Sequence, residues 1–528
     1  MYYVVGSGPS GVSAAVALRA AGLPVTILDV GREAEPDRLS ALRSLATTPE
    51  ERWNAADLDR IRGPLQWDAT FPKLAYGSDF PYAREEIAQL VQHGTRCLWS
   101  HARGGLSNVW GAAVLPNREE DMSDWPVTAA AMAPHYAAAA RLLGIAGRDD
   151  DLAALFPYYE VPEPPARPSR QATLLLATME RHREQLRAAG VHFGQSRLAL
   201  RTRARGSAHE CSYTGLCLAG CPHGAIWSSA HTLDALIANG VHYRRGVVVR
   251  KVEAMDDGVR LLAVDGASGE ATSFVGRRAF LACGPLATAR IVIDSLAAYD
   301  QSFPLRYQPY FLLPMLGLRN GGDVGRERLH TLAQVFIEIT APTVSRHAVH
   351  LQMYTFNEVM RAQLASLARV GWLRRFGEYA LLGRLLAMQG YLHSDDAAPI
   401  TLQSRFDARG GGAQLTLTAA PQTDARRIIG RAVRHLTRHA FAIGAIPLLP
   451  MLRHGEPGEG NHIGAIFPMR DARRPFDTDR LGSLERLPRL HLVDASVLPA
   501  LAATTFTYTV MANAHRIASE VARQDAAA

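Results

Sequence analysis

Three closely spaced cysteines are the strongest chemical signal in the sequence. Cys211, Cys217 and Cys221 lie within eleven residues, in a C-x5-C-x3-C-P spacing that ends at Pro222. The four-cysteine run of ferredoxins is C-x2-C-x2-C-x3-C-P, and this chain departs from it only in having Thr214 at the second cysteine position. Three thiolates are too few for a four-iron cluster, but they suit a [3Fe–4S] cluster.

Two other interpretations of these cysteines stay open. Structural zinc takes four ligands, and His223 follows Cys221 closely enough to supply the fourth. The thiols are otherwise packing groups without a metal, as is common for free cysteine. Cys97 and Cys283 stand alone and are expected to be packing residues. Five cysteines in 528 residues are too few for a disulfide scaffold.

A glycine-rich turn near the start of the chain has the pattern of a dinucleotide-binding loop. The residues from Gly6 to Gly11 read G-S-G-P-S-G and fit G-x-G-x-x-G, between a predicted strand at Tyr2–Val5 and a predicted helix at Ser10–Ala21. Gly6 permits the tight turn, Gly8 lets a pyrophosphate approach the backbone, and Gly11 lets the helix pack closely on the strand. The N-terminus of that helix favours a bound anion.

An acidic residue at the end of the next predicted strand completes this pattern. Asp29 follows Val25–Leu28, where its carboxylate is placed to accept hydrogen bonds from a ribose diol. The strand, helix, strand and terminal acid together predict binding of FAD or NAD, and the motif alone does not distinguish the two.

The elements expected elsewhere predict a second, antiparallel layer. Short or alternating apolar patterns predict further strands at Val247–Val252, Ala279–Ala282, Val335–Ile339, His347–Phe356, Ile400–Phe406 and Gln414–Thr418. Helices are predicted at Asp424–Ile443 and Thr509–Ala522. The fold class is therefore α/β, with a Rossmann-like unit at the N-terminus and an α+β part built on an antiparallel sheet.

The C-terminal part of the chain resembles a known enzyme family. Val493–Pro499 reads V-D-A-S-V-L-P, and after a Thr-rich stretch Met511–Arg516 reads M-A-N-A-H-R. Together they resemble the closing signature of the glucose–methanol–choline (GMC) oxidoreductases. Further segments resemble that family in the same order: Arg103–Gly111, Asp124–Pro126 with Pro134–Tyr136, Ala282–Gly284 with Thr288–Arg290, and Asn461–His462 with Met469. The resemblance is weak over Phe303–Leu452.

The resemblance implies that FAD is the cofactor. Its pyrophosphate would lie at Gly6–Gly11 and its ribose at Asp29, while the loop Gly104–Trp110 would follow its flavin side and Asp494 would lie near its ribityl and phosphate groups. The cofactor-binding residues expected on this basis are Gly6, Gly8, Gly11, Asp29, Gly104, Gly105, Ser107, Asn108, Val248 and Asp494.

The resemblance also implies an acid–base residue. His462 matches the family's catalytic histidine, with Met469 seven residues on, and histidine is suited to taking a proton from a hydroxyl near neutral pH. The second residue of the family's pair, usually His or Asn, is Thr505 here. A Thr hydroxyl can orient a substrate oxygen but accepts no proton at neutral pH, so the base role falls on His462. Asn461 is a neighbouring source of the missing amide.

The cysteine spacing is similar to that of GMC subunits of bacterial FAD-dependent glucose and fructose dehydrogenases, which carry such a cluster. This implies oxidation of a sugar or polyol hydroxyl to a carbonyl, with electrons passed through Cys211, Cys217 and Cys221 to a non-oxygen acceptor, an acceptor protein or small partner subunit. Three alternatives stay open: a GMC oxidase using dioxygen, a dehydrogenase of a hydrophobic or lipid-like alcohol, and a non-catalytic electron-transfer flavoprotein.

The order of the motifs predicts the domain organisation. The FAD-binding domain would comprise residues 1–125, 205–300 and 455–528, and the substrate or cap domain residues 126–204 and 301–454. Within the latter, Asn357–Gln389 has a helical pattern with five arginines flanking an apolar stripe. The stripe is either the core-facing side of a cap helix pair or an interfacial surface for a membrane or a lipid-like substrate.

Composition limits the class of protein. The chain is 48% hydrophobic and 20% charged, which is typical of a globular protein and excludes a disordered one. Only Lys73 and Lys251 of its 57 basic residues are lysines, a bias that is typical of a GC-rich bacterial genome. The arginines are scattered among acids, so we expect no nucleic-acid partner.

The start of the chain and its apolar runs predict its location. The sequence opens directly as a strand rather than as a signal peptide, and no apolar run is long enough to span a membrane. We therefore expect a cytoplasmic protein, with co-export beside a signal-bearing partner subunit and peripheral membrane contact through 357–389 as the alternatives.

Overall fold

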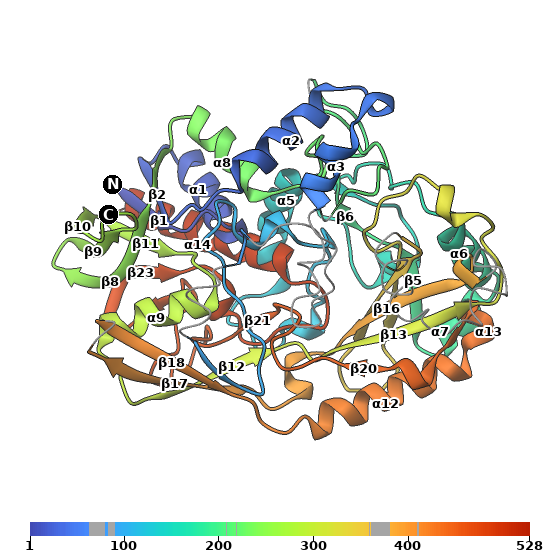
Figure 1. Ribbon diagram of the computed structural model, residues 1–528. Coiled ribbons are helices and arrows are strands. Elements are labelled where there is room, and N and C mark those ends of the chain that lie inside the picture. Colours follow the sequence, from blue (N-terminus) through green and yellow to red (C-terminus); the bar gives the residue numbers. More distant parts are fainter. Residues whose placement is uncertain are drawn as a thin grey trace.

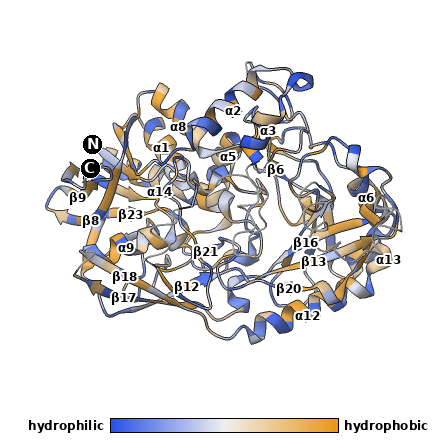
Figure 2. Ribbon diagram, viewed as in Figure 1, coloured by the Kyte–Doolittle hydropathy of each residue, from blue (hydrophilic) through white to orange (hydrophobic). Residues whose placement is uncertain are grey.

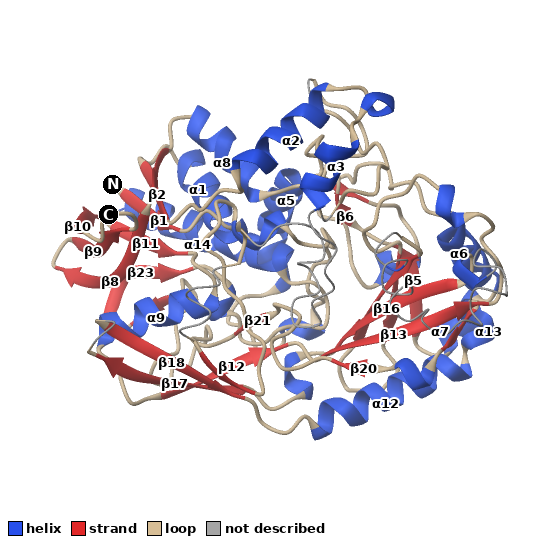
Figure 3. Ribbon diagram, viewed as in Figure 1, coloured by secondary structure: helices blue, strands red, loops and turns tan. Residues whose placement is uncertain are grey.

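The computed structural model describes residues 1–62, 80–82, 90–206, 208–217, 219–357, 360, 381–408 and 411–527. These residues form a mixed α/β fold with one largely parallel sheet and several antiparallel sheets (Figures 1 and 3). The expected α/β fold class with an antiparallel second part is confirmed.

A six-stranded sheet lies on the side of the molecule where the two chain ends meet (Figure 1). Its neighbouring strands are parallel except at one edge, where β22 and β23 are antiparallel. In order, the strands are β22 (Ser483–Leu484), β23 (Leu487–Leu492), β11 (Arg278–Leu281), β1 (Tyr2–Val5), β2 (Val25–Asp29) and β7 (His242–Arg245). Three distant parts of the chain therefore build one sheet.

Helix α1 (Pro9–Ala20) packs on strands of this sheet and also contacts α14 (Thr507–Ala527) and α8 (Ser229–Ala238). Helix α1 begins directly after Gly8, because proline is well suited to the first helical position. Its small and branched residues Val12, Ala14, Ala15 and Leu18 are buried, which allows the close approach of helix and strand.

Two smaller antiparallel sheets adjoin the parallel one. The first is the meander β8 (Val247–Met255), β9 (Gly258–Asp265) and β10 (Ala271–Gly276), which is followed after β11 by α9 (Pro285–Leu296). The second has the order β21 (Ile463–Gly464), β12 (Ser302–Tyr307), β17 (Ile400–Asp407), β18 (Gly412–Thr418) and β3 (Val91–His93), where only the last pair is parallel.

A seven-stranded antiparallel sheet forms the other side of the molecule (Figure 3). Its strands are β19 (Ala445–Pro447), β13 (Tyr310–Gly317), β16 (Leu385–Tyr391), β15 (Val349–Thr355), β14 (Val335–Ile339) and β5 (Val191–Gln195), with β20 (Arg453–His454) also paired to β13. The remaining helices and short strands are α2 (Pro36–Thr47), α3 (Ala55–Arg62), α5 (Ala129–Leu143), α6 (Arg170–Arg181), α7 (Arg183–Ala188), α12 (Thr423–Arg438), α13 (Ala440–Ile443), β4 (Ile145–Ala146) and β6 (Leu198–Ala199).

The seven-stranded sheet buries one face and presents the other toward the rest of the molecule. Its apolar face and the inner sides of α6, α12 and α13 form a separate hydrophobic cluster. Helix α12 is amphipathic: Ile429, Val433 and Leu436 are buried, whereas its outer side is charged, as its mixed colours show (Figure 2). Helix α12 therefore covers the apolar face of the seven-stranded sheet, on the side away from the parallel sheet.

Most predicted elements are observed within a few residues of their expected bounds, among them β1, α1, β14 and β17. The helix expected over Asp424–Ile443 is two helices, because α12 ends at Arg438 and α13 begins at Ala440. The predicted helical segment Asn357–Gln389 lies mostly outside the described residues. Its end is a strand rather than a helix, since Leu385–Gln389 pairs with both β13 and β15.

The domain division stays a prediction. Strands β12, β17 and β18, which were expected in the substrate domain, contribute to the same hydrophobic cluster as the parallel sheet. Within the described part of the chain, no helix combines the length and apolar character that crossing a membrane requires.

Candidate active site

A cavity lies at the carboxyl ends of the parallel strands, where ligands of open α/β sheets generally bind. The glycine loop after β1, the end of β2, the start of β8 and the turn between β11 and α9 form its walls. It brings together predicted residues from both ends of the chain: Gly6, Gly8, Asp29, Gly105, Ser107, Val248, Asn461, His462 and Asp494. Of the residues predicted to bind FAD or to act in catalysis, four are not among its lining: Gly11, Gly104, Asn108 and Thr505.

The glycine loop has the geometry that a bound pyrophosphate requires. Gly6 has φ +100°, and a Cβ there would lie 2.6 Å from the carbonyl oxygen of Ala282. A Cβ on Gly11 would overlap the carbonyl oxygen of Gly6, whereas one on Gly8 would meet no atom within 4 Å. Gly8 thus leaves open space at the N-terminus of α1, which has no side-chain cap. This cradle fits a phosphate group of FAD.

Asp29 lies at the end of β2, in the same cavity. Its Oδ2 accepts hydrogen bonds from the Ser7 hydroxyl and, at 3.1 Å, from the Tyr243 hydroxyl. Burial raises the pKa of Asp29 to about 6, although these hydrogen bonds oppose the shift. Sequence reasoning missed Tyr243, because only the pairing of β7 with β2 brings it here; Ser7 was visible as a polar residue inside the glycine motif.

The second glycine segment forms a tight turn beside the first. The N–H of Gly104 donates to Ser7 Oγ at 2.9 Å, and the carbonyl of Gly104 accepts from Ser107 and Ser229 at 2.6 and 2.8 Å. The Asn108 amide donates to two backbone carbonyls of the same turn. Gly104 and Asn108 therefore shape the turn, and Ser107 is among the residues that line the cavity.

Asp494 is fully buried at the cavity wall and anchors the last strand to α9. Its carboxylate accepts from Thr288 Oγ1 at 2.5 Å and from the N–H of Ser496 at 2.9 Å. Burial raises the pKa of Asp494. Its side chain caps the short turn at Ala495–Val497, so its role in this structure is to fix the backbone that faces the cavity.

His462 lies at the other part of the same cavity, between two aromatic rings. The ring centroids of Tyr391 and Phe506 are 5.2 and 5.1 Å from that of the imidazole. Its Nδ1 is 2.5 Å from Oε1 of Gln308, a residue that no sequence motif indicates. The aromatic contacts hold the plane of the imidazole and shield it from water.

The two residues predicted to assist His462 are Asn461, its half-buried neighbour in the sequence, and Thr505, which precedes the ring contact Phe506. Asn461 has φ +58° and lines the cavity, and its Oδ1 has no hydrogen-bond partner among the described residues. Thr505 is buried, and its Oγ1 also has no partner within the described part of the chain. Buried polar atoms of this kind are normally satisfied. Because Asn461 lines the cavity, its Oδ1 is placed to accept a hydrogen bond from a bound molecule.

The face of the seven-stranded sheet that carries Tyr391 is polar. Gln352 and Gln389 are direct partners across β15 and β16. The Tyr354 hydroxyl donates to Gln352 at 3.0 Å, and the Tyr391 hydroxyl donates to Gln389 at 3.2 Å. The same face also carries the buried pair Glu338 and His350, which are in direct contact, and His350 Nε2 lies 3.1 Å from Nε2 of Gln352. The sheet face behind Tyr391 is therefore polar and includes a carboxyl group.

The three clustered cysteines lie on a loop that packs against the larger hydrophobic cluster. Burial, together with the neighbouring thiols, raises the pKa of Cys211 to about 12 and that of Cys217 to about 11. Because the thiols raise one another's pKa, they lie near one another. The three sulfur atoms nevertheless do not all lie within 4.8 Å of one another. Tetrahedral zinc with Zn–S bonds of about 2.3 Å needs sulfur atoms about 3.8 Å apart, so this arrangement disfavours zinc.

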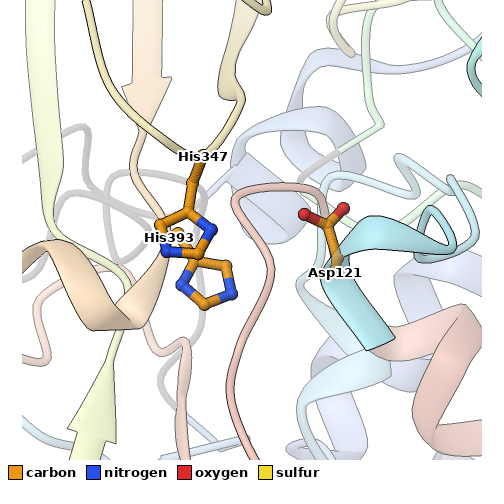
Figure 4. A group of neighbouring side chains, drawn as sticks. All are labelled: Asp121, His347 and His393. Atoms are coloured by element: carbon orange, nitrogen blue, oxygen red, sulfur yellow. The ribbon is translucent and has the colours of Figure 1, made fainter. Parts of the chain in front are cut away.

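A different group of potential metal ligands is Asp121, His347 and His393, whose ligand atoms lie within 4.8 Å of one another (Figure 4). The two imidazole rings are stacked, with centroids 3.8 Å apart and planes 10° apart. Lone pairs of parallel rings do not converge on one ion, and Arg118 already holds both oxygens of Asp121 at 2.8 and 2.9 Å. The geometry therefore favours a structural contact.

Comparison with known proteins gives a likeness in structure but none in sequence. No protein-family model and no curated protein sequence matches this chain. Among solved structures, the chain is similar to the crystal structure of pyridoxine 4-oxidase from Mesorbium loti, with 14% sequence identity, 98% of each chain covered and a TM-score of 0.60. At this identity the likeness shows a shared fold over nearly the whole length of both chains.

Proposed function

We propose that this protein is an FAD-dependent oxidoreductase of the GMC type that oxidises a CH–OH group to a carbonyl. The observation that carries the proposal is one cavity that contains both the dinucleotide-type elements, Gly8 and Asp29, and the imidazole of His462. The GMC-like motifs and the fold shared with an enzyme named as an oxidase support the same reaction class. The fold alone would be a weak argument for function.

In the proposed reaction, the protein supplies acid–base chemistry and positioning. FAD, when bound in this cavity, supplies the hydride acceptor. His462 takes the proton of the substrate hydroxyl, which lets the hydride leave the carbon. Tyr391 and Phe506 pack on the imidazole. Asn461 lines the cavity, and its Oδ1, which has no hydrogen-bond partner among the described residues, is placed to orient the substrate hydroxyl. Thr505 does not line the cavity, so its predicted role is the weaker of the two.

The proposed substrate is a sugar or another polyol. The polar sheet face of Gln352, Gln389, Tyr354 and Tyr391 supports this class, because neutral amides and phenols can donate to and accept from several hydroxyl groups. A panel of polyols and long-chain alcohols under anaerobic conditions tests the assignment.

We further propose that electrons leave through a [3Fe–4S] cluster on Cys211, Cys217 and Cys221 to a non-oxygen acceptor. The spacing of the three cysteines, which departs from the four-cysteine run of ferredoxins only at Thr214, supports this choice. The backbone N–H of Cys211 donates to the carbonyl of Arg201, and the N–H of the nearby Ala199 donates to the carbonyl of Ala112, just after the second glycine turn. Iron and acid-labile sulfide analysis of anaerobically purified protein decides the question, and fully active protein without iron would exclude the cluster.

The central experiment is anaerobic reduction of the bound flavin by the alcohol panel. We expect purified protein to carry FAD and to lose its yellow colour with a polyol. His462→Ala should retain flavin and slow this reduction about 100-fold or more, while His435→Ala, on α12, should not. Peroxide release under air would identify an oxidase instead of a dehydrogenase, and protein that binds no flavin would refute the proposal.

A further inference from the structure

Gln308 lies between β12 and β13 and touches His462 through both its backbone and its side chain. The backbone N–H of Gln308 donates to the carbonyl of His462 at 3.1 Å, and its Oε1 lies 2.5 Å from His462 Nδ1. The side chain of Gln308 is 3% exposed. This contact is therefore held in a buried, preformed geometry.

The orientation of the Gln308 amide follows from its other partners. Its Nε2 donates to the backbone carbonyls of Ala502 and, at 2.7 Å, Thr504. Carbonyl oxygens only accept hydrogen bonds, so the NH2 group must face them and the amide oxygen must face His462. Reversing the amide would place oxygen against two carbonyls and NH2 against the imidazole.

An amide oxygen beside Nδ1 determines the tautomer of a neutral imidazole. Oε1 is an acceptor, so Nδ1 of His462 must carry a proton, and the lone pair that can take a proton is then at Nε2. We propose that Gln308 is a positioning residue that holds His462 in the Nδ1–H tautomer, with Nε2 as the base for the substrate hydroxyl. This inference rests on the proposed function for its consequence, but the tautomer is a property of the protein alone.

The partner of His462 Nδ1 is a neutral amide rather than a carboxylate, and this has a second consequence. A carboxylate in place of the amide would stabilise the imidazolium and raise the pKa of the histidine. A neutral amide orients the ring without that charge, so it favours a base that is neutral at physiological pH. Gln308 thus orients the imidazole without stabilising its charged form.

The first test is ¹⁵N NMR of the flavin-loaded protein labelled on histidine, with His462→Gln used to assign the His462 signals. At a pH where the ring is neutral, we expect a protonated Nδ1 and an unprotonated Nε2. An Nε2–H tautomer in the unaltered protein would overturn the inference, and this measurement needs no substrate and no Gln308 variant.

The second test compares Gln308→Leu, Gln308→Glu and a matched control, Gln171→Leu. Gln171 is also a buried amide whose Nε2 faces two carbonyls and whose Oε1 accepts an N–H, but it is not in the cavity lining. Gln308→Leu should keep FAD, mix the two tautomers and slow flavin reduction about 100-fold at an unchanged KM. Gln308→Glu should move the midpoint of the pH–rate profile to higher pH.

The control separates a positioning role from a loss of stability. Gln171→Leu should lower thermal stability as much as Gln308→Leu does, while its pH–rate profile and tautomer stay unchanged. Equal pH profiles in all three variants would overturn the inference. If no alcohol reduces the flavin of the unaltered protein, the proposed function fails, whereas the tautomer measurement still decides the role of Gln308.

Discussion

The N–H of Gly104 donates a hydrogen bond to the hydroxyl of Ser7 at 2.9 Å, and that hydroxyl in turn donates to Asp29. One small side chain thereby joins the first glycine loop, the end of β2 and the second glycine turn. Each of the three segments contributes residues to the cavity wall. The hydroxyl of Ser7 acts as both donor and acceptor, so no aliphatic residue can replace it.

Replacing Ser7 by alanine should weaken flavin binding more than folding. The variant loses both hydrogen bonds, and we expect a roughly tenfold higher dissociation constant for FAD, or about 1.4 kcal/mol. Titration of apo-protein with FAD measures this. Ser13→Ala is the matched control, since Ser13 is a buried serine of α1 whose hydroxyl donates to Met511 instead. Equal FAD affinity in both variants would contradict the prediction.

Gly8→Ala should mainly weaken FAD binding, whereas Gly11→Ala should mainly lower the stability of the protein. Gly8 has φ −66° and open space at its Cβ position, so Gly8→Ala should change the free energy of unfolding by no more than about 1 kcal/mol. Its methyl group fills the phosphate cradle, and FAD affinity should fall at least about tenfold. Gly11→Ala should cost about 3 kcal/mol of stability, because its Cβ overlaps the carbonyl of Gly6. Urea unfolding of the apo-proteins and FAD titration distinguish the two outcomes.

FAD affinity should fall on acidification because of Asp29. Burial raises the pKa of this carboxyl to about 6, so it gains a proton as the pH falls below 6 and loses an acceptor for ribose hydroxyls. We expect the dissociation constant of FAD to rise between pH 7 and pH 5. Asp29→Asn should bind FAD more weakly at pH 7 and show no such rise. A parallel pH dependence in both proteins would assign the effect to another group.

The stability of the protein should decrease in acid because of His491. Its Nδ1–H donates to the carbonyl of Leu481 at 3.0 Å, and its Nε2 accepts from Arg278 at 3.3 Å, so both nitrogens are used by the neutral ring. Burial lowers its pKa to about 4. The unfolded chain therefore binds a proton that the folded chain rejects, and stability is lost as the pH falls from 6.5 to 4.

The free energy of unfolding lost between pH 6.5 and pH 4 through His491 is on the order of 3 kcal/mol. Urea unfolding at several pH values, compared with His491→Gln, measures it: the variant should be less stable at pH 7 but should lose less between pH 6.5 and 4. His242→Gln, at an exposed position of β7, is the control. The same pH dependence in His491→Gln as in the unaltered protein would exclude His491 as the source.

The local part of the candidate site could be predicted from the sequence. The turn at Gly6–Gly11, the strand that ends at Asp29 and the helix that starts beside Gly8 depend on backbone conformation and apolar spacing within about thirty residues. Short-range patterns of this kind predict local structure, because turn sterics and helix packing act between near neighbours. His462, in contrast, was indicated only by the resemblance of its segment to the GMC family and not by a local structural pattern.

Tertiary structure alone decided which distant residues complete the site. Tyr243 reaches Asp29 through the pairing of β7 with β2, and Gln308 reaches His462 because β12 pairs with β21. The polar face of Gln352 and Gln389 exists only because β15 and β16 are in register. It also decided that Leu385–Gln389 is a strand, since pairing on both sides outweighs a helical spacing of apolar residues. Sequence determines local conformation through neighbouring atoms, whereas these contacts depend on the free energy of packing the whole chain.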